Sequence, residues 1–350
     1  MTSSYSQKLG NELDAFIQNL SHQAPRRSEW KENSTFEQWQ AETTKRFREK
    51  LGAFPENPDE LQPELLEQTV CEGYTRERIE ITTYEYLRMP MYVLIPEHVA
   101  DSTPIVFAIH GHGYGSREIV GLEPDGSVRH GDPGLHQDFA LSLVRQGFIV
   151  LAPELLGFGD RRLTEDRMLA EHDPSKNSCF RLSSALLMIG QTIAGYRIYE
   201  TMRAIDYVQN RWQNQAHRLG IMGISGGGLV AGFTAALDAR ISCAVISGYA
   251  NTFQDSILAR SHCLDNYIPG ILLESEMPDL LGLIAPRSLL IESGDTDALF
   301  VRAGVHTALE RLTVLFEAAG RVDGLQVDLF KGGHEIHGKP AFEWLRKELN

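Results

Sequence analysis

Two spacings of apolar residues alternate along this chain, and each change of spacing marks the boundary of a predicted element. Apolar side chains recur at helical spacing over about residues 5–20 and again over about 36–51, which predicts two amphipathic helices. Prolines then interrupt regular structure as far as residue 63. We therefore expect residues 1–70 to form a helical extension that packs on a main domain of residues 71–350.

From residue 75 onward, short apolar runs alternate with helical patterns. A strand hairpin is expected over 75–95, and six further strands over 103–109, 147–152, 219–224, 241–247, 287–292 and 325–330. Helices are expected over about 136–145, 185–212, 303–319 and 340–349. Strands that are apolar along most of their length are typical of a parallel sheet covered on both faces. This order predicts an α/β fold with a mostly parallel, doubly wound sheet and helices on both faces.

The clearest functional pattern is Gly223-Ile-Ser225-Gly-Gly, which lies between a predicted strand and a predicted helix. A tight turn at this junction would hold Ser225 in strained backbone geometry, and glycines are needed beside it because a Cβ would clash there. This is the context of a nucleophile elbow, in which the serine hydroxyl projects from the end of the strand. The pattern therefore predicts Ser225 as a nucleophile.

Other candidate residues lie at the ends of predicted strands, where the functional groups of such sheets gather. Asp295 and Asp297 follow one strand, and His334 and His337 follow the last one. Nucleophile, acid and histidine thus come in the chain order of an α/β-hydrolase triad. His334 is the preferred base because it lies nearer the strand end, with His337 as the alternative. Both aspartates qualify as the carboxylate that orients the imidazole.

Attack on a carbonyl group also requires two amides that stabilise the developing oxyanion. Gly226 N–H, directly after the nucleophile, is one candidate, and the loop His110-Gly-His-Gly113 after the first buried strand supplies the other. Within that loop His112 N–H is preferred, and Gly113 N–H is the alternative. The His110 side chain is expected to position the loop backbone. Contact with the substrate is its alternative role.

Candidate substrate contacts also lie outside these motifs. Glu154 and Arg161, just beyond a predicted strand, are two of them, with structural ion pairing as an equal alternative, and Tyr267 is a third. Residues 162–184 fit neither spacing, and we expect them to form an irregular, lid-like excursion over the strand ends. This excursion and residues 262–276 are expected to shape the pocket.

The spacing of the histidines and glycines does not favour metal or nucleotide chemistry. His334 and His337 are three positions apart, whereas the H-E-x-x-H zinc motif needs histidines four apart on one helical face. His110 and His112 would point in opposite directions in an extended chain. No glycine-rich phosphate-binding motif follows the first strand. We therefore expect no metal and no cofactor.

The composition of the chain indicates which partners it could bind, but it does not indicate the fold. The 350 residues carry a formal net charge of −14, which argues against nucleic acid or an anionic membrane as a partner. The four cysteines are widely spaced, and the N-terminus shows no basic segment followed by an apolar one, so we expect a cytoplasmic protein with reduced thiols. The oligomeric state stays open. The N-terminal helices could form a homodimer interface, but packing on their own chain is the simpler arrangement.

Seven stretches from residue 109 onward carry a family resemblance: Ile109-His-Gly-His-Gly, Ala152-Pro-Glu-Leu-Leu-Gly-Phe-Gly-Asp-Arg, Gly190-Gln-Thr-Ile-Ala-Gly-Tyr-Arg, Met202-Arg-Ala-Ile-Asp-Tyr-Val, Gly223-Ile-Ser-Gly-Gly-Gly, Ala285-Pro-Arg-Ser-Leu-Leu-Ile-Glu-Ser-Gly and Gly333-His-Glu-Ile-His-Gly. Together they resemble the α/β-hydrolase superfamily, specifically its bacterial dienelactone-hydrolase-like and acetyl-xylan-esterase-like branch. The resemblance implies the α/β-hydrolase fold and gives Ser225, Asp297 and His334 as the triad. Dienelactone hydrolases proper use a cysteine nucleophile, so the serine here favours the hydrolysis of esters or acetyl esters.

The residues and the resemblance together predict a serine hydrolase that cleaves small carboxylic esters through an acyl-enzyme on Ser225. Acetyl esters of sugars are one option for the substrate. A peptidase or C–C bond hydrolase with the same triad is the first alternative. A non-catalytic binding protein on the same fold is the second.

Overall fold

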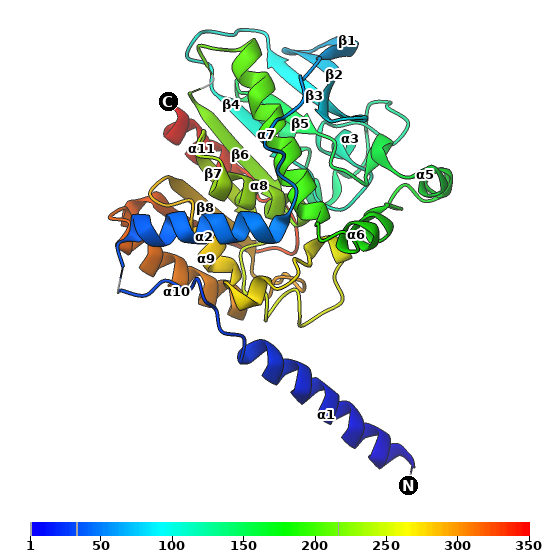
Figure 1. Cartoon of the computed structure of the whole chain (residues 1–350). Coiled ribbons are helices and arrows are strands. Elements are labelled where there is room, and N and C mark those ends of the chain that lie inside the picture. Colours follow the sequence, from blue (N-terminus) through cyan, green and yellow to red (C-terminus); the bar gives the residue numbers. More distant parts are fainter. Residues whose placement is uncertain (1, 33, 216) are drawn as a thin grey trace.

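A computed structural model describes residues 2–32, 34–215 and 217–350 of the chain. At its centre lies a nine-stranded sheet with the order β1-β2-β3-β5-β4-β6-β7-β8-β9 (Figure 1). The strands are β1 (Glu64–Cys71), β2 (Tyr74–Tyr84), β3 (Leu87–Pro96), β4 (Ile105–Ile109), β5 (Ile149–Pro153), β6 (Leu219–Ile224), β7 (Ile241–Ser247), β8 (Ser288–Gly294) and β9 (Leu325–Phe330). Strands β4 to β9 pair in parallel, whereas β1, β2 and β3 form antiparallel pairs at one edge. The mostly parallel sheet predicted from the sequence is confirmed.

Strands β4, β5 and β6 carry only apolar residues and glycine because both faces of the sheet are covered. In β4, Ile105, Phe107 and Ile109 belong to one hydrophobic core, while Val106 and Ala108 belong to the other. All five side chains are fully buried. The sheet is therefore doubly wound, as expected.

Helices from different parts of the chain complete the two cores. The first core includes residues of α2 (Phe36–Leu51), α7 (Ile193–Arg211), α8 (Gly226–Leu237), α9 (Met277–Gly282) and α10 (Arg302–Ala318). The second includes residues of α3 (Ser116–Ile119), α4 (Phe139–Arg145) and α11 (Lys339–Leu349). Short 3₁₀ turns lie at η1 (Gly134–His136), η2 (Gly159–Arg161), η3 (Leu264–Asn266), η4 (Ile271–Leu273) and η5 (Val322–Gly324).

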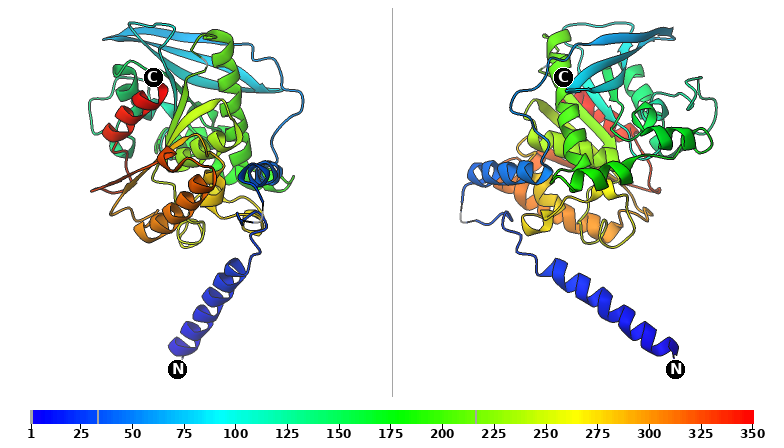
Figure 2. Two further views of the ribbon diagram at one scale, coloured as in Figure 1. Left: turned by 90° about the vertical axis from the view of Figure 1, so that its left-hand side faces the viewer. Right: turned by 45° about the vertical axis from the view of Figure 1, so that its right-hand side comes forward.

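The two N-terminal helices differ in how they are placed. Helix α1 (Thr2–His22) extends away from the body of the molecule (Figure 2), and Leu13, Phe16, Ile17 and Leu20 on it are exposed. Helix α2 instead contacts α7, α8 and α9. A capping box at Thr35 begins α2, and Gly52 in the left-handed region ends it. Within the predicted extension, α2 packs on the main domain, and Trp30 and Leu61 outside this helix also belong to its hydrophobic core.

Three local features differ from the sequence-based expectation. The excursion 162–184 is not irregular, because it contains α5 (Thr164–Ala170) and the first part of α6 (Cys179–Leu187). The long helix expected over 185–212 is broken near Gly190, whose φ of 74° does not fit a helix. Strand β1 was missed, since it is an edge strand with exposed side chains and no apolar alternation. The boundary predicted at residue 70 falls inside β1.

Within the described ranges, no helix combines the length and the apolar character needed to cross a membrane.

The packing of α2 can be tested by truncating Phe47, which is 1% exposed and meets the Phe233 ring edge-on at 4.9 Å. We expect Phe47→Ala to lower the free energy of unfolding in urea by about 3–5 kcal/mol, because it leaves a cavity between α2 and α8. The exposed neighbour Glu49 gives the matched control, and Glu49→Ala should change that energy by less than about 0.5 kcal/mol. Equal effects of the two substitutions would contradict the packing of α2 on the main domain.

Candidate active site

Ser225 lies at the sharp turn between β6 and α8. Its backbone has φ 56° and ψ −127°, in the region of positive φ that residues with a side chain rarely adopt. The turn is possible because Gly223 and Gly227 lie too close to neighbouring main-chain atoms to carry a Cβ. A Cβ on Gly223 would come 2.2 Å from Gly227 O, and a Cβ on Gly227 would come 2.2 Å from Ile109 O. The strand, tight turn and helix expected around Ser225 are therefore present.

His334 and Asp297 form a hydrogen-bonded pair in the loops after β9 and β8. His334 Nδ1 lies 2.7 Å from Asp297 Oδ2. The other carboxylate oxygen of Asp297 accepts the amides of Leu299 and Phe300, and the Phe300 ring stacks on His334 at 5.7 Å. These contacts fix the orientation of the imidazole. Its second nitrogen, Nε2, is buried and makes no hydrogen bond within the described part of the chain.

The Asp297 carboxylate remains ionised at neutral pH. Burial alone would raise its pKa, but the hydrogen bond and charge of His334 and the amides of Phe300 and Leu299 outweigh burial and lower it. An ionised Asp297 holds the proton of His334 on Nδ1 and leaves Nε2 as an acceptor.

A backbone contact brings the serine loop towards this pair. Ser225 N–H donates to Ser247 O at 3.0 Å, at the end of β7. The next residue, Gly248, lies against the histidine ring, and a Cβ there would come 3.0 Å from both Cε1 and Nδ1 of His334. The ends of β6 and β7 and the loop after β9 thus meet at one edge of the sheet.

His337 and Asp295, the alternative base and acid, form contacts with other residues and not with each other. His337 Nδ1 lies 2.7 Å from Asp328 Oδ2 at the surface. Asp295 Oδ1 accepts Gly332 N–H at 3.2 Å, which closes the turn between the two loops. The geometry therefore favours Asp297 and His334 over Asp295 and His337 as the acid and base.

The loop after β4 offers free amides beside the elbow. Gly111 N–H donates to His136 Nε2 and Tyr114 N–H donates to Glu118 Oε2, both at 2.9 Å. Between them, the amides of His112 and Gly113 donate to no group among the residues that the structure describes. Gly226 opens α8, where backbone N–H groups have no partner within the helix. The His112 ring packs against Gly226, since a Cβ there would lie 3.2 Å from His112 Cε1 and Nδ1.

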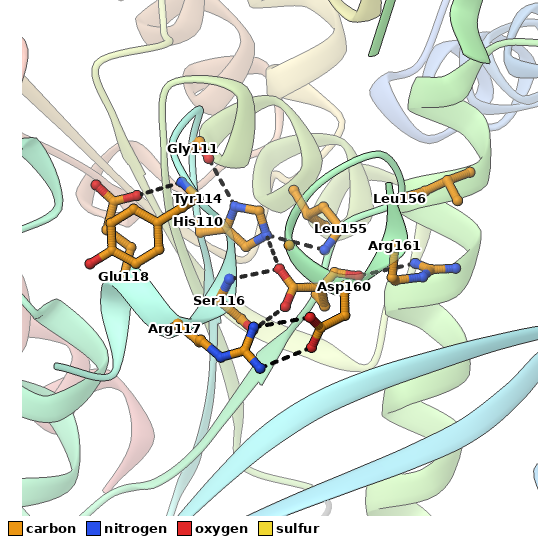
Figure 3. Close-up of polar contacts among 12 residues, drawn as sticks. His110, Gly111, Tyr114, Ser116, Arg117, Glu118, Leu155, Leu156, Asp160 and Arg161 are labelled. Atoms are coloured by element: carbon orange, nitrogen blue, oxygen red, sulfur yellow. Dashed lines mark hydrogen bonds and ion pairs between the residues drawn. The ribbon is translucent and has the colours of Figure 1, made fainter. Parts of the chain in front are cut away.

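Sequence reasoning missed the side chains that support this loop. His136 is fully buried, accepts Gly111 N–H through Nε2, and places Nδ1 3.1 Å from Glu118 Oε1. The other oxygen of Glu118 accepts Tyr114 N–H, a contact that Figure 3 shows. The two side chains hold both ends of the loop around its free amides. Because they lie far apart in the sequence and form no spacing motif, only the folded chain shows their relation.

Three of the four predicted substrate contacts are structural instead. His110 is fully buried, with Nδ1 2.8 Å from Gly111 O and Nε2 accepting Leu155 N–H at 3.1 Å (Figure 3). Burial raises the pKa of Glu154, which accepts both the amide and the hydroxyl of Ser116. All three side chains are shielded from solvent, which favours the structural roles that the sequence analysis also allowed for His110, Glu154 and Arg161 over contact with substrate.

Arg161 shows why ion pairing was the better of its two interpretations. Its guanidinium donates to both carboxylate oxygens of Glu200 at 2.7 and 2.5 Å and to Glu154 O at 3.0 Å. The pair is almost completely buried, so Arg161 joins η2 to α7 rather than facing a pocket.

Tyr267, the fourth predicted substrate contact, lines a surface hollow. The hollow has a volume of about 240 Å³ and a largely apolar lining that includes Phe253, Ile257, Asn266 and Ile268. A larger hollow of about 430 Å³, between β2 and α7, is lined by none of the predicted site residues.

The known proteins that this chain resembles are named as hydrolases or esterases. A model of the Abhydrolase family matches residues 15–310. YtaP of Bacillus subtilis, named as a candidate hydrolase, is 28% identical over 307 residues, which cover 84% of this chain and 93% of that protein. The solved structure of a candidate acetyl xylan esterase of Bacteroides fragilis has a TM-score of 0.78 at 19% identity and covers 95% of this chain and 94% of its own. A glucuronoyl esterase of Solibacter usitatus has a TM-score of 0.67 at 14% identity, with 93% and 98% covered.

The buried state of His110 predicts a specific loss of stability in acid. Burial lowers its pKa from 6.5 to about 3, so between these values the unfolded chain binds a proton that the folded chain excludes. The contribution of the neutral His110 side chain to the free energy of unfolding is therefore complete above pH about 6.5 and is lost as the pH falls. Between pH about 6 and about 4, the free energy of unfolding of the wild type should fall more steeply than that of His110→Gln, by about 1.4 kcal/mol per pH unit. Equal slopes in urea titrations would contradict a neutral, buried His110.

Proposed function

Because the chain belongs to the Abhydrolase family, we propose that it is a serine hydrolase that cleaves carboxylic esters through an acyl-enzyme on Ser225. The observation that carries this proposal is the His334–Asp297 hydrogen bond of 2.7 Å, at the same sheet edge as a strained serine turn. His334 Nε2 is free of other hydrogen bonds in the described structure, as a base for Ser225 requires.

In the first half-reaction, Ser225 Oγ attacks the ester carbonyl carbon while His334 Nε2 takes the hydroxyl proton. Asp297 keeps the Nδ1 proton in place and offsets the positive charge of the imidazolium. The tetrahedral intermediate then collapses: the bond to the alcohol oxygen breaks, and the proton on His334 passes to that oxygen. The acyl group remains on Ser225.

Water completes the cycle by the same steps. His334 takes a proton from a water molecule, whose oxygen attacks the acyl carbon. The second tetrahedral intermediate releases the carboxylic acid and returns the proton to Ser225 Oγ. The products are one acid and one alcohol, and the sum consumes one water molecule.

The amides of Gly226 and His112 are the proposed oxyanion donors. Both are beside Ser225, because one follows it in the chain and the His112 ring packs against Gly226. Two amides that are already in position need no reorganisation as charge develops on the oxygen, and one such donor contributes about 10²–10³-fold to kcat. His136 and Glu118 act as positioning residues that hold the loop in this geometry.

Small esters of sugars are the proposed substrate class. Two structures of similar fold are named as an acetyl xylan esterase candidate and a glucuronoyl esterase, and both names describe esters on sugar units. In this chain, Tyr267 and the apolar hollow around it would contact the acyl or alcohol group. A preference for peptides without any ester turnover would contradict the proposal.

A fluorophosphonate probe tests the nucleophile directly. Wild-type protein should be labelled, and Ser225→Ala should be unlabelled and should lose p-nitrophenyl acetate turnover, because Ser225 is the one serine with a positive φ in the described part of the chain. Ser242 in β7 is a half-buried serine outside the site and gives the control. Undiminished labelling of Ser225→Ala, or equal loss in Ser242→Ala, would overturn the assignment.

Two matched pairs of substitutions test the acid and base. His334→Asn and Asp297→Asn should each lower kcat by at least about 10³-fold, because the proton acceptor or its correct tautomer is lost. His337→Asn and Asp295→Asn change the same residue types in the same loops and should leave kcat close to that of the wild type. The reverse pattern in steady-state ester hydrolysis would assign the roles to His337 and Asp295 instead.

A further inference from the structure

Outside the proposed triad, four side chains with metal-binding atoms lie close together, and one of them belongs to the loop after β4. They are His112 in that loop, Cys179 at the start of α6, and Cys263 and Asp265 at η3. Each offers one ligand atom, and these atoms all lie within 4.8 Å of one another. Cys179 and Asp265 are buried, whereas His112 and Cys263 are partly exposed.

We propose that these four residues form a structural binding site for one zinc ion. Two thiolates, one imidazole nitrogen and one carboxylate oxygen are ligand types that zinc takes in tetrahedral geometry. Such a site is complete with protein ligands and leaves no position for a reacting water molecule. It is therefore separate from the serine chemistry and consistent with it.

The distance between the imidazole and the carboxylate fits zinc better than it fits a hydrogen bond. His112 Nε2 lies 3.3 Å from Asp265 Oδ2. Two atoms held about 2.0 Å from one zinc ion at the tetrahedral angle are about 3.3 Å apart. The same nitrogen is buried and makes no hydrogen bond of acceptable geometry among the described residues. A ligand bond would satisfy it.

Arg197 of α7 completes the surroundings of the site. Its guanidinium donates to Asp265 Oδ2 at 2.6 Å and to Cys179 Sγ at 3.0 Å. Asp265 Oδ1 in turn accepts Asn266 Nδ2–H at 2.8 Å. With zinc bound, the charges of the ion, two thiolates, one carboxylate and Arg197 sum to zero. Outer hydrogen bonds of this kind orient the ligands of metal sites.

Two other arrangements of the same residues compete with zinc. In one, both thiols keep their protons and a protonated His112 pairs with Asp265. In the other, Cys179 and Cys263 join in a disulfide. Neither uses all four side chains at once, so measured metal content and thiol state separate them from the zinc site.

Zinc would connect three separate segments beside the elbow. It would link the loop after β4, the start of α6 and η3, and α6 and η3 are already in contact. Anchoring the His112 ring would also hold the His112 amide in place, which is the only step of this inference that rests on the proposed function.

The experiment measures zinc in the full-length protein purified with a reductant and dialysed against equimolar zinc. We expect about one zinc ion per chain by elemental mass spectrometry for the wild type, and less than about a tenth of that for Cys263→Ser. Cys71 is a second partly exposed cysteine outside the cluster, and Cys71→Ser should retain the metal. Cobalt in place of zinc should give the visible absorption of a tetrahedral thiolate site in the wild type and in Cys71→Ser only.

A chelator keeps the test decisive if Cys263→Ser does not fold. Removal of zinc from the wild type should lower the Tm by several degrees, and zinc but not magnesium should restore it. No stoichiometric zinc in the wild type, equal zinc in Cys263→Ser, or a Cys179–Cys263 disulfide in the reduced protein would overturn the site. Ser225→Ala should keep its zinc, so loss of the metal site and failure of the serine assignment are distinguishable.

Discussion

The positive φ of Ser225 is the constraint on which the rest of the site depends. A residue with a Cβ is held in this conformation only if the surrounding structure fixes the turn. Here the turn is fixed by main chain on both sides, with Gly223 against Gly227 and Gly227 against the carbonyl of Ile109. These contacts bring the end of β4, and with it the loop of free amides, to the nucleophile. They also explain why larger residues cannot replace these glycines.

Around this turn, buried polar groups provide rigidity rather than chemistry. His110, Glu154 and Arg161 are enclosed by the loops that they join, and their partners are backbone amides and carbonyls, Ser116 and Glu200. A buried polar group that lost its partner would destabilise the fold by about 1–3 kcal/mol, so the loops are held in one arrangement. The proposed base differs, because His334 Nε2 makes no hydrogen bond among the residues that the structure describes.

Much of the fold and of the candidate triad could be predicted from the sequence, because local patterns encode both. Apolar runs predicted the buried strands, and the rule that functional groups gather at strand ends selected Ser225, His334 and the pair Asp295 and Asp297. The family resemblance then favoured Asp297. Residues 162–184 contain helices with few buried side chains, so their apolar spacing was weak.

Long-range contacts could not be predicted in this way. His136 approaches Gly111, and Cys179 approaches Cys263, only because the folded chain places distant segments side by side. The burial of a charged side chain could not be predicted either. A charged residue that follows a strand can line a pocket, or it can be buried in polar contacts within the protein. In the structure, Arg161 forms a buried ion pair with Glu200, and the buried Glu154 carboxylate accepts hydrogen bonds from Ser116.

The most direct test of the central claim is to trap the acyl-enzyme. The protein is mixed with p-nitrophenyl acetate, quenched in acid within the first turnover and analysed by peptide mass spectrometry. The account predicts one added acetyl group on the peptide that contains Ser225, with none on that peptide in His334→Asn. Ester turnover without an acetyl group on Ser225, or with one at a different residue, would contradict it.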